Sequence, residues 1–183
     1  MSISSKAHQR ANLIHRCFLT KDPATLIRAF IVYVRPILEY CSSVWSPSLI
    51  TDIDCIEKVQ RRFTKRLAGL YDLNYGDRLI ALGIDSLERR RLNADLILTY
   101  KIVFNLIDLQ FNDFFVFNTN SLRGHRYKLF MPRYALDVRK HFFSQRVINP
   151  WNNLDPVKTN FQSLSTFKRS LSINNISPYL IFK

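Results

Sequence analysis

The sequence of 183 residues has only four glycines and no long apolar segment. Glycine supplies the tight turns of phosphate-binding loops, and no glycine-rich loop of the Walker or Rossmann kind is present. The longest uninterrupted apolar run, Ala29 to Val34, is far shorter than the roughly 20 residues that cross a bilayer. We therefore expect neither a nucleotide-binding loop nor a transmembrane helix.

Cysteine is scarce as well. Cys17, Cys41 and Cys55 are odd in number, and no two of them have CxxC spacing. The N-terminal residues 1–18 lack the long apolar segment and the small-residue cleavage site of a secretory signal. We expect an intracellular protein, in the nucleus or the cytoplasm, whose thiols are reduced and partly buried.

Acidic residues are few, and the chemistry that depends on them is missing. Lys and Arg number 27 against 14 Asp and Glu, so the formal net charge is +13. This excess favours an anionic partner, either nucleic acid or an acidic membrane surface, although a merely solvated basic surface is the alternative. No Asp-Asp pair, HExxH motif or GxSxG elbow occurs, and Asp52 with Asp54 is better explained by helix capping. We predict no catalytic centre and no zinc site.

What the sequence does have is enough apolar material for a core, with 47% hydrophobic and 13% aromatic residues. Apolar residues recur at steps of three and four, which predicts a mainly α fold. The expected helices cover residues 4–19, 23–36, 51–69, 77–82, 85–109 and 163–172. The sustained helical periodicity ends near residue 109. We therefore expect a helical domain at 1–109 and a less regular basic extension with a short terminal helix at 110–183.

Local signals mark where these helices begin and end. Asp22 and Pro23 predict an N-cap followed by an N1 proline, and Pro36 predicts that the same helix kinks or ends. That helix is apolar nearly all round and is expected to be central. Arg35 and Glu39, one turn apart, are expected to pair at the edge of the core. The sequences Thr51 to Asp54 and Asp85 to Glu88 resemble capping boxes.

Basic side chains gather on two helices. Lys58, Arg61, Arg62 and Lys65 lie opposite the apolar face of the helix over 51–69, with Arg66 at its border. They favour phosphate contact, with a solvated face as the alternative. Arg89, Arg90 and Arg91 lie near a helix N-terminus and oppose the helix dipole, so a ligand phosphate or a carboxylate such as Glu88 or Asp85 would explain them.

In the extension, basic residues alternate with aromatic residues. Cations neutralise phosphates while rings stack on bases, so this pattern favours contact with a nucleic-acid strand. Phe142 and Phe143 fit equally well as anchors that dock the extension on the helical core. The candidate binding residues here are Arg123, Arg126, Lys128, Arg139, Lys140 and Arg146.

Several segments together resemble one known family. They are "ISSKAHQRANLIHRCF", "VRPILEYCSSVWSP", "IEKVQRRFTKRLAGL", "DRLIALGIDSLERRR", "DLILTYKIVFNL", "RGHRYKL", "RKHFFSQRVINPWNNL" and "FKRSL". In this order and spacing they resemble the region after the palm in reverse transcriptases of LINE-type, jockey-like non-LTR retrotransposons. The resemblance covers about residues 3–172.

The resemblance implies a role. It predicts a helical thumb-like bundle and a C-terminal extension that hold template–primer or target nucleic acid, as an RNA–DNA or DNA duplex. In that family the catalytic Asp-Asp motif and its divalent metals belong to the palm, which would lie upstream of Met1. We therefore expect a non-catalytic C-terminal fragment of an RNA-directed DNA polymerase, with no cofactor in this chain.

Other hypotheses stay open at this point. One is a protein-interaction module that docks on a polymerase palm, and another is a degenerate element remnant without function. An enzymatic hypothesis would require the chain itself to extend a primer. No membrane partner and no small-molecule substrate are expected.

Overall fold

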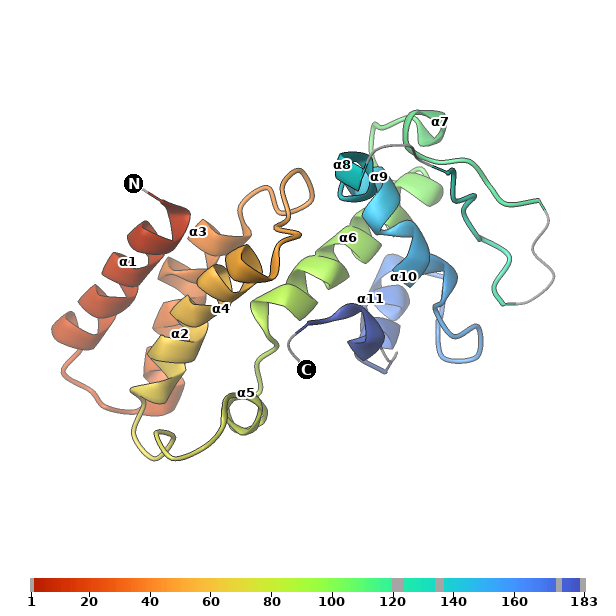
Figure 1. The fold of residues 1–183 in the computed structure, drawn as a ribbon. Helices are drawn as coiled ribbons and strands as arrows, with labels where there is room; N and C mark the ends of the chain where they lie inside the picture. The colour runs from red at the N-terminus through yellow and green to blue at the C-terminus, as the bar shows by residue number, and fades with distance from the viewer. Residues whose placement is uncertain (1, 120–123, 134–136, 174–175, 182–183) are drawn as a thin grey trace. The chain divides into compact units, whose positions relative to one another are not determined.

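The computed structural model describes residues 2–119, 124–133, 137–173 and 176–181, and these are mainly helical, which confirms the expected fold class (Figure 1). The longer helices are α1 (Ile3–Cys17), α2 (Pro23–Tyr33), α4 (Ile50–Lys65), α5 (Tyr75–Leu82), α6 (Leu87–Val103) and α11 (Leu164–Ile173). The short ones are α3 (Arg35–Glu39), α7 (Phe111–Phe114), α8 (Asp137–Lys140), α9 (Phe143–Arg146), α10 (Ile148–Asn152) and the 3-10 helix η1 (Ser177–Tyr179).

The chain forms two compact units. Unit 1 consists of Met1–Cys41, Pro47–Arg90 and Ile181–Lys183, and unit 2 consists of Ser42–Ser46 and Arg91–Leu180. The units divide inside α6, whereas the boundary predicted from the sequence lies near residue 109. The reason is that the first turn of α6 packs in unit 1, while Leu96, Tyr100 and Ile102 of the same helix belong to the core of unit 2.

The core of unit 1 is built by α1, which packs against α2, α3 and α4. Ala7 and Ala11 are buried on α1 and, being small, allow the helices to approach closely. Phe30 of α2 and Phe63 of α4 are both enclosed, with ring centroids 4.6 Å apart. Helix α4 is thereby fixed along one side by apolar contacts.

The ends of α2 follow the local signals. Asp22 is the N-cap, its carboxylate accepting from the Thr25 N–H at 2.8 Å, and Pro23 is the first helical residue. The helix ends at Tyr33, and α3 resumes at Arg35 with Pro36 in its first turn, so the predicted interruption is confirmed. Its all-round burial is wrong, because Val32 and Tyr33 are each 54% exposed.

Both predicted capping boxes are wrong. Helix α4 begins at Ile50 with Leu49 at the N-cap and no side-chain cap, and Asp54 instead accepts from Lys58 and Arg61. At the start of α6, the Ser86 hydroxyl rather than the Asp85 carboxylate accepts from the Arg89 N–H, at 3.2 Å. At both sites the acid has a basic side chain within reach on the next turns, and it pairs with that instead.

The core of unit 2 surrounds Trp151 and Phe167, which are fully buried. The Trp151 Nε1 donates to the Tyr127 carbonyl at 2.7 Å, and an isolated antiparallel bridge joins Phe117 to Leu129. The predicted terminal helix is present as α11, and it contributes Phe167 and Leu171 to this core. The residues of the extension thus share one core with the part of α6 that belongs to unit 2.

Three further expectations can be compared with the structure. Cys17, Cys41 and Cys55 are free thiols, but all three are exposed, so the expected partial burial is wrong. Arg35 and Glu39 do pair, with 3.8 Å between Nε and Oε2. No helix in the described part of the chain combines the length and the apolar character that crossing a membrane requires.

Candidate nucleic-acid interface

A groove of about 670 Å³ lies between α1 and α4 in unit 1. The α1 side contributes polar side chains and the α4 side contributes cations, with Phe63 and Val59 at its base. Its lining is Ser2, Ser4, Ser5, His8, Ala11, Asn12, His15, Cys55, Lys58, Val59, Arg62, Phe63, Lys65 and Arg66. We call this the α1–α4 groove.

Four cations line the α1–α4 groove, and no carboxylate is among its lining residues. They are Lys58, Arg62, Lys65 and Arg66, and all four side chains are exposed. Lys58 is paired at the edge of the groove with Asp54, at 2.7 Å, and Arg66 donates to the Asn12 Oδ1 at 2.7 Å. A polyanion entering here would meet positive charge that is only partly compensated by the protein.

The fold of α4 explains why these cations gather. Ile53, Ile56, Val59 and Phe63 are buried at three- and four-residue steps, which turns the intervening Lys58, Arg62 and Lys65 away from the core. The bases occupy the C-terminal half of the helix, where the helix dipole favours positive charge. The sequence pattern and the local electrostatics therefore agree.

Helix α1 is held against α4 by polar and ring contacts. The Ser4 hydroxyl donates to the Cys55 carbonyl at 3.2 Å, and the His15 ring lies 4.5 Å from the Phe63 ring. His8 and Asn12 lie between these two contacts along α1. These contacts hold the helix that forms the α1 wall of the groove against α4.

The two histidines of the groove report its positive character. Partial burial is the main cause that lowers the pKa of His8, and the charge of Arg62 lowers it further. The pKa of His15 is likewise lowered first by burial and then by Arg66, with a smaller effect of Lys21. Burial first, and neighbouring cations second, therefore lower the pKa of both side chains.

Arg61, which the sequence grouped with these cations, lies on another side of α4. Its Nη1 donates to Asp54 at 2.9 Å, and its guanidinium lies 5.2 Å from the centre of the Tyr75 ring. Arg61 is not among the groove residues. The candidate set on α4 is therefore Lys58, Arg62, Lys65 and Arg66.

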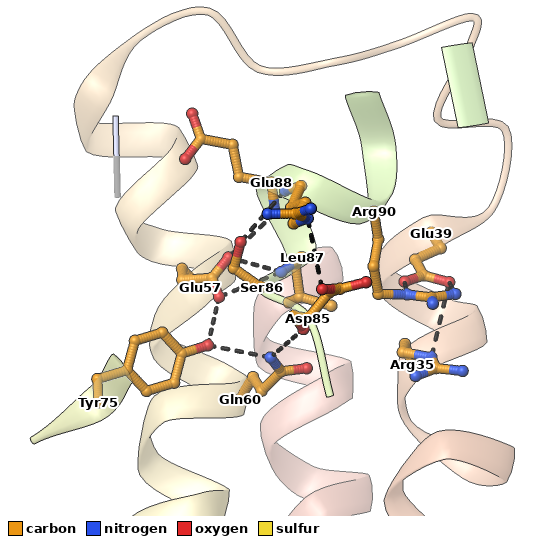
Figure 2. A network of polar contacts seen from close by, with 11 residues as sticks. Arg35, Glu39, Glu57, Gln60, Tyr75, Asp85, Ser86, Leu87, Glu88 and Arg90 are labelled. Carbon is orange, nitrogen blue, oxygen red and sulfur yellow. Dashed lines mark hydrogen bonds and ion pairs between the residues drawn. The ribbon is translucent and has the colours of Figure 1, made fainter. Parts of the chain in front are cut away.

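A buried polar network in unit 1 connects α4 to the start of α6 (Figure 2). The Glu57 carboxylate, 1% exposed, accepts from the Leu87 N–H at 3.1 Å, from the Glu88 N–H at 3.3 Å, and from the Tyr75 hydroxyl. Gln60 donates to the same hydroxyl and to the Asp85 carbonyl, each at 3.0 Å. Burial and the adjacent Glu57 charge raise the pKa of Tyr75 far above its ordinary value.

Arg89 and Arg90 are engaged by carboxylates of the same unit. Arg90 pairs with Glu39 through two bonds, one of them 3.0 Å from Nη2 to Oε2, and Figure 2 shows Arg35 reaching toward the same carboxylate. Arg89 lies 3.5 Å from Asp85. The carboxylate partners considered from the sequence thus account for Arg89, and a more distant one, Glu39, accounts for Arg90.

In unit 2, Arg91 and Arg146 are likewise structural. Arg91 is 4% exposed, with its guanidinium 5.4 Å from the Trp45 ring centre. Arg146 forms a fork with the buried Asp95, at 2.8 and 3.0 Å, and also donates to the carbonyls of Ser42 and Ser43. Burial raises the pKa of Asp95, and Arg146 opposes that rise.

The remaining candidates lie on the surface of unit 2. Arg126 is exposed and its guanidinium contacts Tyr127, donating to the hydroxyl at 2.6 Å. Lys128 is half-buried beside Gly124, whose φ of 95° favours glycine. Arg139 is exposed, and Lys140 pairs with Asp137 at 2.6 Å. Arg123 lies outside the described residues.

The sequence reasoning missed the α1 side of the groove. His8, Asn12 and His15 follow one another at steps of four and three, which places them on one helical face. That spacing was a usable signal, but the histidines were considered only as zinc ligands. The structural role of Glu57 has no such signal, because the N–H groups that it accepts from belong to a distant segment.

Comparison of the chain with models of protein families, with curated proteins and with solved structures gave no match. The resemblance to LINE-type reverse transcriptases therefore stays a prediction. That resemblance also implies divalent metals at a palm, and no group of three or more His, Cys, Asp or Glu side chains suited to a metal occurs among the residues that the structure describes.

Proposed function

We propose that this chain binds the phosphate backbone of nucleic acid through the α1–α4 groove, as a non-catalytic thumb-like part of a retrotransposon reverse transcriptase. The observation that carries the proposal is the lining of the groove. Four exposed cations face it and no carboxylate does. Such a surface attracts phosphates and offers few groups that would repel them.

The resemblance in sequence supports the same function from another direction. In the family that the chain resembles, the corresponding helices hold a template–primer duplex. Duplex backbone is thus the ligand that fits both the charge of the groove and the motifs. The bases of a duplex are paired and stacked, so this contact is expected to be largely independent of sequence.

The salt dependence of duplex binding tests the proposal. Each phosphate neutralised by the protein contributes about 0.9 to the slope of log K against log salt for B-DNA. We expect Arg62→Ala with Arg66→Ala to flatten the slope by about two units and to weaken binding at low salt. Fluorescence anisotropy with labelled DNA and RNA–DNA duplexes provides the measurement.

A matched control removes the same charge elsewhere in unit 1. Arg10 on α1 and Arg28 on α2 are exposed and are not among the groove residues. Arg10→Ala with Arg28→Ala lowers the net charge equally, and its slope should stay close to that of the parent chain. Equal losses in the two double variants would refute the assignment of the groove.

A second function, docking on a polymerase palm, is favoured by apolar side chains that remain exposed in unit 1. Val32 and Tyr33 end α2 with 54% of each exposed, and Leu49 and Ile50 begin α4 with 63% and 62% exposed. Sedimentation distinguishes this function. A palm-docking chain should self-associate alone or bind added palm protein, whereas a monomer that ignores the palm contradicts it.

A further inference from the structure

The α1 wall of the groove contains a histidine, His8, which is taken as neutral in the formal net charge of the chain. His8 lines the groove one helical turn beyond Ser4 and Ser5, and Arg62 of α4 is close enough to act on it electrostatically. A phosphate that contacts Arg62 would therefore also lie near the His8 imidazole. The first turn of α1, whose N–H groups carry partial positive charge, adds to the attraction at this end.

We propose that His8 is a further phosphate-binding residue of the α1–α4 groove and that nucleic-acid binding takes up a proton at this side chain. This inference rests on the proposed function of the groove. In the free protein the neighbouring cation opposes protonation of the imidazole. A bound phosphate brings negative charge to the same place, so protonated His8 becomes both a charge partner and a hydrogen-bond donor.

Among the residues that the structure describes, the charged side chains that line the groove with His8 are all cations, and Asp54 at its edge is paired with Lys58 and Arg61. The groove consists of α1, α4 and their flanking residues, and its titratable side chains other than the histidines are Cys55, Lys58, Arg62, Lys65 and Arg66. His15 lies at the other end, against Phe63, where Arg66 and Lys21 act on it. With no carboxylate in the lining, the ligand itself has to supply the negative charge that stabilises an imidazolium.

The physical consequence is a dependence of affinity on pH. By linkage, each proton taken up on binding strengthens binding by at most tenfold for each unit of falling pH. Because one histidine titrates over part of the range, we expect affinity to rise about three- to tenfold between about pH 8 and about pH 5.5. The duplex should carry 5′-hydroxyl ends, since a terminal phosphate has a pKa near 6 and would itself titrate.

The test compares His8→Gln with His141→Gln at constant ionic strength. His141 is exposed, lies in unit 2 and is not among the groove residues, so its variant should keep the full rise. His8→Gln should lose most of the rise while keeping its salt slope at about pH 8, where imidazole is neutral. Calorimetry in buffers of different ionisation enthalpy should show proton uptake by the parent chain and less by His8→Gln.

The outcomes separate the two claims. The role of His8 is overturned if the affinity does not depend on pH, or if His8→Gln keeps the rise in affinity at low pH. The proposed function of the groove still stands in that case if the salt slope depends on Arg62 and Arg66. Both claims are overturned if the Arg62→Ala, Arg66→Ala variant loses no more binding than the Arg10→Ala, Arg28→Ala variant and His8→Gln has the same pH dependence as His141→Gln. A rise removed by His8→Gln and kept by His141→Gln supports the proposal.

Discussion

Replacing Glu57 should weaken unit 1 more than any other single change in its polar network. The carboxylate is 1% exposed and accepts from the Leu87 and Glu88 N–H groups and from the Tyr75 hydroxyl. In Glu57→Met, a variant of similar volume, these donors lose their acceptor. A buried donor left without a partner costs about 1–3 kcal/mol, so one buried donor and two half-buried donors predict a loss of about 3–5 kcal/mol.

Two related variants separate the contributions. Glu57→Gln keeps one carbonyl oxygen but turns an NH₂ group toward the remaining donors, so we expect an intermediate loss of about 1–2 kcal/mol. Tyr75→Phe removes the hydroxyl that donates to Glu57 and accepts from Gln60, and it should cost about 1–2 kcal/mol. The losses of Glu57→Met and Tyr75→Phe should not add in the double variant, because both remove the same hydrogen bond.

Urea unfolding followed by far-UV circular dichroism measures these losses, provided that the m-value stays constant. Amide hydrogen exchange gives a local readout, and the Leu87 and Glu88 amides should exchange faster in Glu57→Met than in the parent chain. A loss below about 1 kcal/mol for Glu57→Met, with unchanged exchange at these two amides, would refute the cap.

Three further predictions concern other parts of the chain. Arg146→Met leaves the 3% exposed Asp95 unpaired and should destabilise unit 2 by about 3–5 kcal/mol in urea unfolding, while Arg146→Met with Asp95→Leu should recover much of the loss. Burial lowers the pKa of His125, so the unfolded chain binds more protons below about pH 6.5; stability should fall as the pH drops through that range, and less steeply in His125→Gln. Gly83→Ala should cost about 1 kcal/mol and Gly83→Asn less in thermal unfolding, because φ is 62° at this helix end.

Features that depend on neighbouring residues were predictable from the sequence. The Asp22 cap, the interruption of α2 near Pro36 and the core face of α11 all follow from local spacing. Most of the predicted cations of α4 do share one face, since the buried Ile53, Ile56 and Phe63 fix which side points outward, but Arg61 does not. The period of a helix carries this information without any knowledge of the tertiary structure.

Features that depend on residues far away in the sequence could not be predicted from it. Glu57 looked like one acid in the first turns of a helix, and only the approach of Leu87 makes it a cap for α6. Arg90 and Arg146 looked like candidates for phosphate, but Glu39 and Asp95, each 51 residues away, take them up. A buried ion pair and an exposed basic side chain have the same local sequence, so composition alone cannot separate them.

The location of the bound duplex tests the central claim most directly, and the chain carries suitable probes. All three cysteines are exposed, but only Cys55 lines the α1–α4 groove. Alkylation of the parent chain with iodoacetamide, with and without duplex, can be read at each cysteine by mass spectrometry. We predict that duplex slows the alkylation of Cys55 and leaves Cys17 and Cys41 unchanged; equal rates at Cys55 with and without saturating duplex would contradict the account.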